Sequence, residues 1–372
     1  MDSLPVTIGV LKEIASGERR VALVPADIKR LSTRARFYVQ AGAGAPAGFA
    51  DRDYVAAGAR ISTAQNVVAA ADVLVKIRPP EATETLREKT VLICLGGREP
   101  RVIAGLGIRS VTHLGLERLP RTARAQTMDV LSSQAALAGY AAVLEGARRL
   151  DVLLPMMTTA AGTIRPAKMI ALGAGVAGLQ AIATARRLGA QVFGFDVRET
   201  AREQVESLGA RFVSLDVAPS GAASPSGYAA EQTDADQRAI RTALAKHLPS
   251  MQLIITSAQI PGRPAPLLMD EDMVAALSPG TVVVDMAAES GGNTTLTLPD
   301  EAVTVAGVHI LGPTNLPSTL ATDASRLFSA NVRALLEHIL TRENQSSLDP
   351  NDAIIAALLA GQTPPPHALA VA

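Results

Sequence analysis

The chain has 372 residues, of which 48% are hydrophobic and 19% charged, and its 35 basic and 35 acidic side chains balance to no net charge. This length predicts two or three domains with well-filled cores, and a neutral chain without tryptophan gives no reason to expect nucleic-acid binding. The single cysteine, Cys94, excludes an internal disulfide framework and a cysteine-rich zinc site, so we predict no metal centre and a small buried hydrophobe at this position.

Short apolar runs separated by helical patterns fill the first third of the chain. Helices are expected at residues 25–31 and 51–57, between strand-like runs. These runs begin at Val6, Arg36, Asp72, Thr90 and Ser110. Apolar strands that alternate with helices indicate a parallel sheet covered on both faces.

A glycine-rich stretch then carries the most informative pattern of the chain. The apolar run Met169–Leu172 leads into Gly173, Gly175 and Gly178, and a helical pattern and a second apolar run follow before Asp196. This order of strand, glycines, helix, strand and acid predicts a dinucleotide-binding βαβ unit. Here Gly173 permits a tight turn, Gly175 lets the backbone approach a pyrophosphate, and Gly178 lets the helix pack close to its strand.

The acid at the end of this unit bears on the choice of cofactor. Asp196 is expected to accept a hydrogen bond from a ribose 2′-OH and to repel a 2′-phosphate, which favours NAD(H) over NADP(H). Arg198 lies two residues further on, and an arginine there can receive a 2′-phosphate. NAD(H) is therefore the predicted cofactor, with NADP(H) as the alternative.

The same alternation continues to the end of a second α/β unit, with strand-like runs at Gln191, Arg211, Gln252, Thr281 and Val308. Long helical patterns at residues 125–150 and 318–340, the second with a Ser318 cap after Pro317, lead out of the first unit and back to it. We therefore predict an α/β fold of two Rossmann-like, doubly wound parallel-sheet domains, joined by long helices with a cleft between them. The N-terminal domain is expected at residues 1–135 and 318–372, and the NAD(H)-binding domain at 136–317.

Residues 217–236 break this pattern with serine, glycine, proline, alanine and acidic residues. Composition allows a disordered surface loop, and the position after the third strand of the nucleotide domain allows a mobile lid over the cofactor. The sequence leaves both interpretations open.

Several strings resemble the superfamily of alanine dehydrogenase and proton-translocating nicotinamide nucleotide transhydrogenase, and within it the NAD(H)-binding component of the transhydrogenase. They include GERRVALVP from Gly17, RTARAQTMDVLSSQ from Arg121, GAGVAGLQAIATARRLGA from Gly173 and AAESGGN from Ala287. The resemblance implies a proton-translocating, Si/Re-specific NAD(P)+ transhydrogenase. In such an enzyme, NADH on this chain passes hydride to NADP+ on a partner subunit.

The resemblance also implies the site residues. Gln126, Asp129 and Ser132 would orient the nicotinamide, and their spacing would place them on one helix face. Arg121 would lie beside them, and Tyr228 would reach the site from a mobile loop. The other cofactor-binding positions would be Thr122, Ala123, Arg124, Gly173, Gly175, Val176, Ala177, Gly178, Asp196, Val197, Arg198, Gly227, Ala258, Gln259 and Glu289.

Partners and location follow from the same resemblance. No apolar run reaches the length of a membrane-spanning helix and no signal region opens the sequence, so we expect no direct membrane insertion. The chain would then be cytoplasmic, attached peripherally to the inner membrane through NADP(H)-binding and membrane-spanning subunits. A homodimer formed through the nucleotide domains is also expected.

Two alternatives remain at this point. A self-contained NAD-dependent amino-acid dehydrogenase would use Arg20, Lys76 and Glu289, but it also needs an acid or base at the substrate carbonyl. Alanine dehydrogenases carry a histidine after the fourth strand, where this chain reads VLICLGGREP from Val91. Hydride transfer between two nicotinamides needs no such group. The third interpretation is an NAD(H)-sensing relative that has lost its partner.

Overall fold

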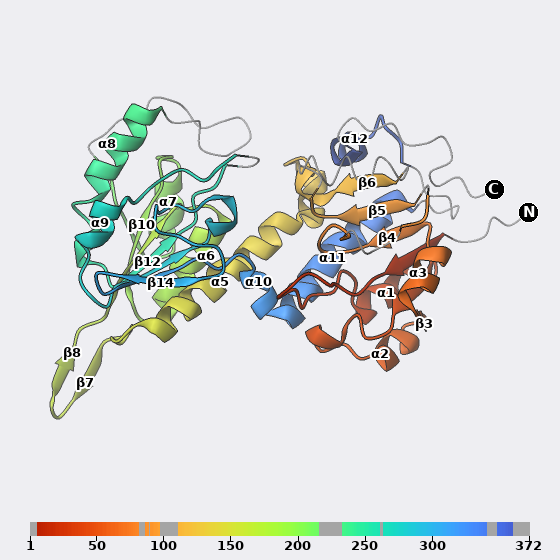
Figure 1. Ribbon diagram of the computed structural model, residues 1–372, viewed down its shortest axis with the longest axis horizontal. Coiled ribbons are helices and arrows are strands. Elements are labelled where there is room, and N and C mark those ends of the chain that lie inside the picture. The colour runs from red at the N-terminus through yellow and green to blue at the C-terminus, as the bar shows by residue number, and fades with distance from the viewer. Residues whose placement is uncertain are drawn as a thin grey trace, which may run out of the picture. The chain divides into compact units, whose positions relative to one another are not determined.

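The computed structural model shows two compact units (Figure 1). The first consists of Met1–Gln134 and Pro317–Ala372, and the second of Ala135–Leu316. The boundaries predicted from the sequence lie one residue further along the chain in both cases. The residues that the structure describes are 6–81, 86–88, 90–96, 111–215, 233–260, 263–340 and 348–359.

The first unit is built on a six-stranded parallel sheet in the order β3-β2-β1-β4-β5-β6. Its strands are β1 (Thr7–Val10), β2 (Arg36–Gln40), β3 (Arg60–Ser62), β4 (Val73–Val75), β5 (Val91–Cys94) and β6 (Thr112–Gly115). The strand order reverses at β1, which confirms the doubly wound arrangement. Strand β3 was missed because its three residues include only one apolar side chain.

Side chains of this sheet alternate between two apolar clusters, one on each face. Val73 and Val75 belong to the larger core, with residues of α1 and α11, whereas Leu74 belongs to a smaller cluster with Val67 of α3. The helices of this unit are α1 (Pro25–Leu31), α2 (Asp51–Ala56), α3 (Ala64–Ala70), α11 (Ala321–Ile339) and α12 (Ala353–Leu359). Both faces are therefore covered, as a parallel sheet requires.

Helix α11 belongs to the core of the first unit although it follows the second unit in the chain. Its buried residues include Phe328, Val332 and Leu335. Two buried serines add polar contacts: Ser325 Oγ accepts a hydrogen bond from Val21 N at 3.0 Å, and Ser329 Oγ accepts one from Val24 N at 2.9 Å. These bonds satisfy backbone donors that would otherwise be buried without partners.

The second unit has a seven-stranded sheet in the order β11-β10-β9-β12-β13-β15-β14. Its strands are β9 (Lys168–Leu172), β10 (Gln191–Phe195), β11 (Arg211–Phe212), β12 (Leu253–Thr256), β13 (Val282–Asp285), β14 (Ala302–Val305) and β15 (Val308–Leu311). The helices between them are α6 (Val176–Arg187), α7 (Ala201–Ser207), α8 (Asp234–Leu244) and α9 (Glu271–Ala275). The all-parallel prediction was wrong at one edge, because β14 pairs antiparallel with β15 through a tight turn.

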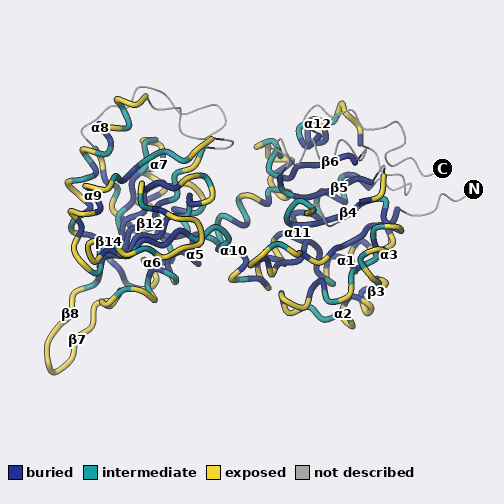
Figure 2. The backbone as a smooth tube through the Cα atoms, in the orientation of Figure 1, coloured by how far each residue is buried: buried dark blue, intermediate teal, exposed yellow. Residues whose placement is uncertain are grey.

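A separate two-stranded hairpin, β7 (Met157–Thr159) and β8 (Gly162–Ile164), was not predicted from the sequence. All six of its strand residues are exposed, as the yellow tube in Figure 2 shows, whereas the strands of the main sheets are largely buried. Among the helices in the described portion of the chain, none is both long and apolar enough to cross a lipid bilayer.

The first long helix predicted from the sequence is interrupted at Asp129. Residues Ala123–Met128 form a 3-10 helix, η3, and α5 runs only from Val130 to Arg149. The Asp129 carboxylate accepts the backbone N–H of Ser132 at 3.0 Å. This side-chain bond competes with helix continuation and instead caps the start of α5.

The second long helix is also divided. Residues Leu316–Thr319 form α10, and α11 begins at Ala321. Ser318 was predicted to cap it, but its hydroxyl donates to Gly17 O at 2.8 Å and accepts from Arg19 N at 2.7 Å. The serine therefore holds the segment after β1 and caps no helix.

Candidate functional site

The glycine turn between β9 and α6 has the conformation that the sequence predicted. Gly173 follows the last residue of β9 and has φ +104°, a left-handed value that favours glycine. Gly175 is the N-cap residue of α6, and a Cβ built on it would meet nothing within 4 Å. The first turn of α6 is thus open on the side where a backbone N–H could receive an anion.

Close backbone contacts explain two further glycines. A Cβ on Gly178 would lie 1.8 Å from Gly173 O, so only glycine allows α6 to fold back onto its own turn. A Cβ on Gly139 of α5 would lie 2.1 Å from Ala177 O. The first turn of α6, with Val176 and Ala177, is therefore held from both sides by backbone.

Asp196, which follows β10, is tied to this turn. Its carboxylate accepts Ala174 N at 2.8 Å, and the Nε and Nη2 atoms of Arg198 each donate to it at 2.9 Å. Although burial pushes its pKa upward, hydrogen bonds from Arg198 and Ala174 hold the pKa of Asp196 below its usual value. The structure therefore places an ionised, hydrogen-bonded carboxylate beside the glycine turn.

A buried network after β12 and β13, which was not predicted from the sequence, supports the neighbouring segment. Asn293, which is fully buried, accepts Ala258 N at 3.1 Å and donates to Ala258 O and Pro266 O, each at 2.8 Å. Asp285, also fully buried, accepts the N–H of Asn293 at 2.6 Å. The only sequence signal for these two residues was their place next to strands and glycines.

The predicted site residues in this region depend on that network. Ala258 is held by Asn293, as described above, and Gln259 Nε2 donates to Met286 O at 3.0 Å. Glu289 lies exposed on a short 3-10 helix, Ala288–Ser290, that follows β13. Val197 is half-buried against the core of the second unit.

The three polar residues assigned to the nicotinamide belong to the first unit. Ser132 Oγ donates to Asp129 Oδ2 at 2.6 Å, so these two side chains lie together at the start of α5. Gln126 is exposed on η3, and its carbonyl accepts Asp129 N at 3.3 Å. The expectation of a single helix face was wrong, because a 3-10 helix ends between the first and second of these residues.

The segment that carries them is anchored by its neighbours. Asn331 of α11 donates to Thr127 O at 2.8 Å, and Arg124 forms an ion pair with Asp352 at 2.8 Å. Burial opposes ionisation of Asp352, but backbone hydrogen bonds and His338 lower its pKa to about 2. Arg121, Thr122 and Ala123 are exposed on the same segment. Arg124, predicted to bind cofactor, therefore has a structural partner.

Two predicted site residues, Gly227 and Tyr228, lie outside the described residues, as does most of the proposed lid. The end of the predicted loop belongs to α8, because Thr233 Oγ1 accepts Asp236 N at 3.1 Å and forms a capping box there. The loop was thus predicted four residues too long.

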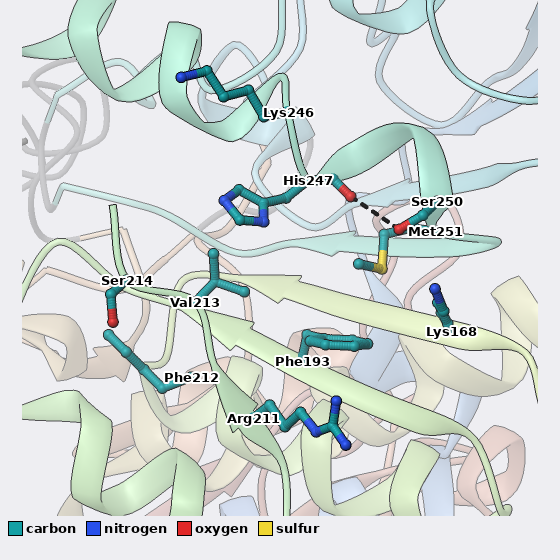
Figure 3. A pocket seen from close by; sticks show the side chains of 10 residues that line it. All are labelled: Lys168, Phe193, Arg211, Phe212, Val213, Ser214, Lys246, His247, Ser250 and Met251. Atoms are coloured by element: carbon teal, nitrogen blue, oxygen red, sulfur yellow. Dashed lines mark hydrogen bonds between the residues drawn. The ribbon is translucent and has the colours of Figure 1, made fainter. Parts of the chain in front are cut away.

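A hollow of about 390 Å³ in the second unit lies away from the glycine turn. Figure 3 shows Lys168, Arg211, Lys246 and His247 around it, with Phe193 among its apolar lining. Lys168 is the first residue of β9, whereas the glycine turn follows the last, roughly 13 Å further along the strand. The hollow therefore does not coincide with the predicted cofactor site.

Comparison with known proteins adds to this geometry. The model of the alanine dehydrogenase/PNT C-terminal domain matches residues 142–363, and that of the N-terminal domain matches residues 9–138. The chain belongs to this family. It is 44% identical over 337 residues to the first of the chains that make up the NAD(P) transhydrogenase subunit alpha of Rhodospirillum rubrum, covering 87% of this chain and 88% of the relative. The resemblance identified from sequence strings is confirmed.

Two solved structures of family members share the fold. The transhydrogenase from Sinorhizobium meliloti aligns with a TM-score of 0.85 at 39% identity, over 94% of this chain and 97% of that one. An L-alanine dehydrogenase aligns with a TM-score of 0.76 at 26% identity, over 94% and 93% respectively. The fold is thus common to both branches of the alanine dehydrogenase/PNT family, and the choice between their activities depends on individual residues.

Arg20 and Lys76, the residues of the dehydrogenase alternative, are buried in internal contacts. Arg20 donates from Nε and Nη2 to Glu18 at 2.8 and 2.6 Å and from Nη1 to Gln134 at 2.9 Å. Lys76 Nζ lies 3.7 Å from Glu13, whose pKa burial raises to about 7. The carboxylate that Arg20 binds is therefore one of the chain's own.

His113 and Cys94 form a buried pair in the same unit. Cys94 Sγ lies 3.3 Å from His113 Nε2, and both residues are at most 1% exposed. Burial lowers the pKa of His113 to about 4, so the imidazole is neutral at physiological pH. Both positions belong to the core, as expected from their apolar neighbours.

Proposed function

We propose that this chain is the NAD(H)-binding subunit of a proton-translocating NAD(P)+ transhydrogenase. Hydride would pass between NADH on this chain and NADP+ held by a partner, coupled to proton movement across a membrane. The observation that carries the proposal is the glycine turn with Asp196 beside it, in a chain 44% identical to a transhydrogenase alpha subunit.

The chemistry of the first unit supports this choice over an amino-acid dehydrogenase. A dehydrogenase of that kind binds a substrate carboxylate, and Arg20 is the residue the resemblance offers for it. Both outer nitrogens of the Arg20 fork are engaged by Glu18 and Gln134, so a substrate would have to displace buried partners. Hydride transfer between two nicotinamides needs positioning and exclusion of water only.

The proposed assembly includes partner subunits. An NADP(H)-binding subunit and a membrane-spanning subunit would hold this chain at the inner membrane from the cytoplasmic side. The name of the relative in Rhodospirillum rubrum describes only the first portion of a subunit alpha, which supports an enzyme divided among several chains.

Gln126 and Asp129 provide the main test of this proposal. With the purified NADP(H)-binding partner, Gln126→Ala and Asp129→Ala are each expected to slow hydride transfer by about 10²-fold, because a misplaced ring loses its reactive geometry. Stopped-flow transfer between NADH and an NADP+ analogue measures the rate. Asp129→Ala also removes a helix cap and should cost about 1 kcal/mol of stability, which Gln126→Ala should not.

The matched control is Gln204→Ala on α7 of the second unit, which should leave transfer unchanged. Unchanged rates in both site variants would remove the orienting role. Reduction of NAD+ by the isolated protein with alanine, in the absence of any partner, would instead favour the dehydrogenase.

A homodimer belongs to the proposal, and the β7–β8 hairpin supports it. Met157 and Ile164 are paired on one face of the hairpin and are 43% and 50% exposed, whereas Thr158 and Thr163 pair on the other. An isolated two-stranded hairpin is marginally stable in water, so a partner surface would account for its order.

The double variant Met157→Asp, Ile164→Asp is therefore expected to shift the mass from twice 38.6 kDa to 38.6 kDa in light scattering. Thr158→Asp on the opposite face should remain dimeric. A monomeric wild-type protein would refute the dimer, and a dimer that survives the double variant would refute the role of the hairpin.

A further inference from the structure

The acceptor sites of Asp196 are already filled by its own chain. Its two carboxylate oxygens accept hydrogen bonds from Ala174 N at 2.8 Å and from the backbone N, Nε and Nη2 of Arg198, each at 2.9 Å. A carboxylate offers about four lone-pair sites. A ribose 2′-OH therefore finds an acceptor on Asp196 only when the Arg198 side chain withdraws.

The Arg198 side chain closes this arrangement like a clamp. Its side chain is 22% exposed and that of Asp196 only 7%, so the ion pair is shielded from water on the carboxylate side. Arg198 Nη2 also donates to Ala174 O at 3.4 Å, inside the glycine turn. The guanidinium fork matches carboxylates and phosphates equally well, so the group that covers Asp196 is also the group that could bind a 2′-phosphate.

We propose that Asp196 and Arg198 act as one latch that sets the preference between NADH and NADPH. This inference rests on the proposed NAD(H) site. While the latch is closed, Arg198 compensates the charge of Asp196 and so weakens its repulsion of a 2′-phosphate. Asp196, in turn, keeps Arg198 from binding that phosphate. Each residue therefore limits the selectivity that the other would impose alone.

The two single variants should change selectivity in opposite directions. Arg198→Gln leaves the negative charge uncompensated and opens acceptor sites for the ribose, so the ratio Kd(NADPH)/Kd(NADH) should rise about tenfold. Asp196→Asn still offers Ala174 an acceptor oxygen but releases Arg198, so the same ratio should fall about tenfold. Titrations that follow the fluorescence of NADH and NADPH give both constants for each protein.

Two more variants separate this role from a merely structural one. Arg198→Lys keeps the charge but loses the two-pronged contact, and its ratio should lie between those of wild type and Arg198→Gln. Arg202→Gln is the matched control, because Arg202 pairs with Glu199 and Glu206 and lies over Phe212, with its ratio expected to stay at the wild-type value. A general loss of folding would weaken both cofactors together and leave the ratio unaltered.

The outcomes are distinguishable from those of the proposed function. Opposite shifts in Arg198→Gln and Asp196→Asn support the latch. A wild-type protein that binds NADH, together with a ratio that is unchanged or lowered in Arg198→Gln, overturns the latch and leaves the NAD(H) site intact. A wild-type protein that binds neither nucleotide overturns both.

Discussion

Replacing Gly178 by alanine is expected to abolish NADH binding and to lower the free energy of unfolding by about 3 kcal/mol. The new Cβ would lie 1.8 Å from Gly173 O and 2.9 Å from Gly173 C, and neither backbone atom can move without opening the turn. At an ordinary helix position the same change would instead add about 1 kcal/mol. The sign of the effect in urea unfolding therefore reports the close contact directly.

Gly175→Ala is the control that separates folding from binding. Gly175 has φ −79° and open space around its missing Cβ, so alanine there should leave the unfolding midpoint within error of wild type. The added methyl group would occupy the approach to the pyrophosphate, so NADH affinity should fall at least tenfold. Tight NADH binding by Gly175→Ala would contradict the proposed position of the cofactor.

Asp285→Ala is the second substitution with a large expected effect. Asp285 is fully buried at the end of β13 and accepts hydrogen bonds from Thr256 Oγ1, Ala287 N, Asn293 N and Thr294 N. Removing the carboxylate leaves several buried donors without an acceptor, and each costs about 1–3 kcal/mol. We expect a loss of about 4 kcal/mol, measured by urea unfolding.

Asp300→Asn provides the comparison for this variant. Asp300 also accepts from a threonine, Thr314, through Oγ1 at 2.7 Å and N at 2.9 Å, but it is exposed. Its loss should cost less than about 1 kcal/mol. Equal effects of the two substitutions would show that burial of Asp285 does not set its contribution.

The local sequence was sufficient for the β9–α6–β10 unit, because every residue that defines it lies within one stretch of chain. Gly173, Gly178 and Asp196 interact with each other and with the intervening backbone, so their spacing already encodes the contact. The family resemblance then extended the prediction to the whole fold.

Features that depend on distant partners could not be predicted in this way. Asn293 acts on Ala258, 35 residues earlier, and neither residue type indicates the other. Strands β3 and β14 are short and half-polar, so their pairing comes from neighbouring strands and not from their own pattern. The break at Asp129 was missed because the apolar periodicity continues across it, although aspartate is a strong helix cap.

The position of α11 determines the order in which the chain can fold during synthesis. The second unit, Ala135–Leu316, is continuous and is complete before α11 leaves the ribosome. The first unit begins earlier but lacks a share of its core until Phe328, Val332 and Leu335 have been made. Domains fold as units, so the N-terminal strands must wait for the C-terminal helix. The unit translated in the middle of the chain is thus the first able to reach its native state.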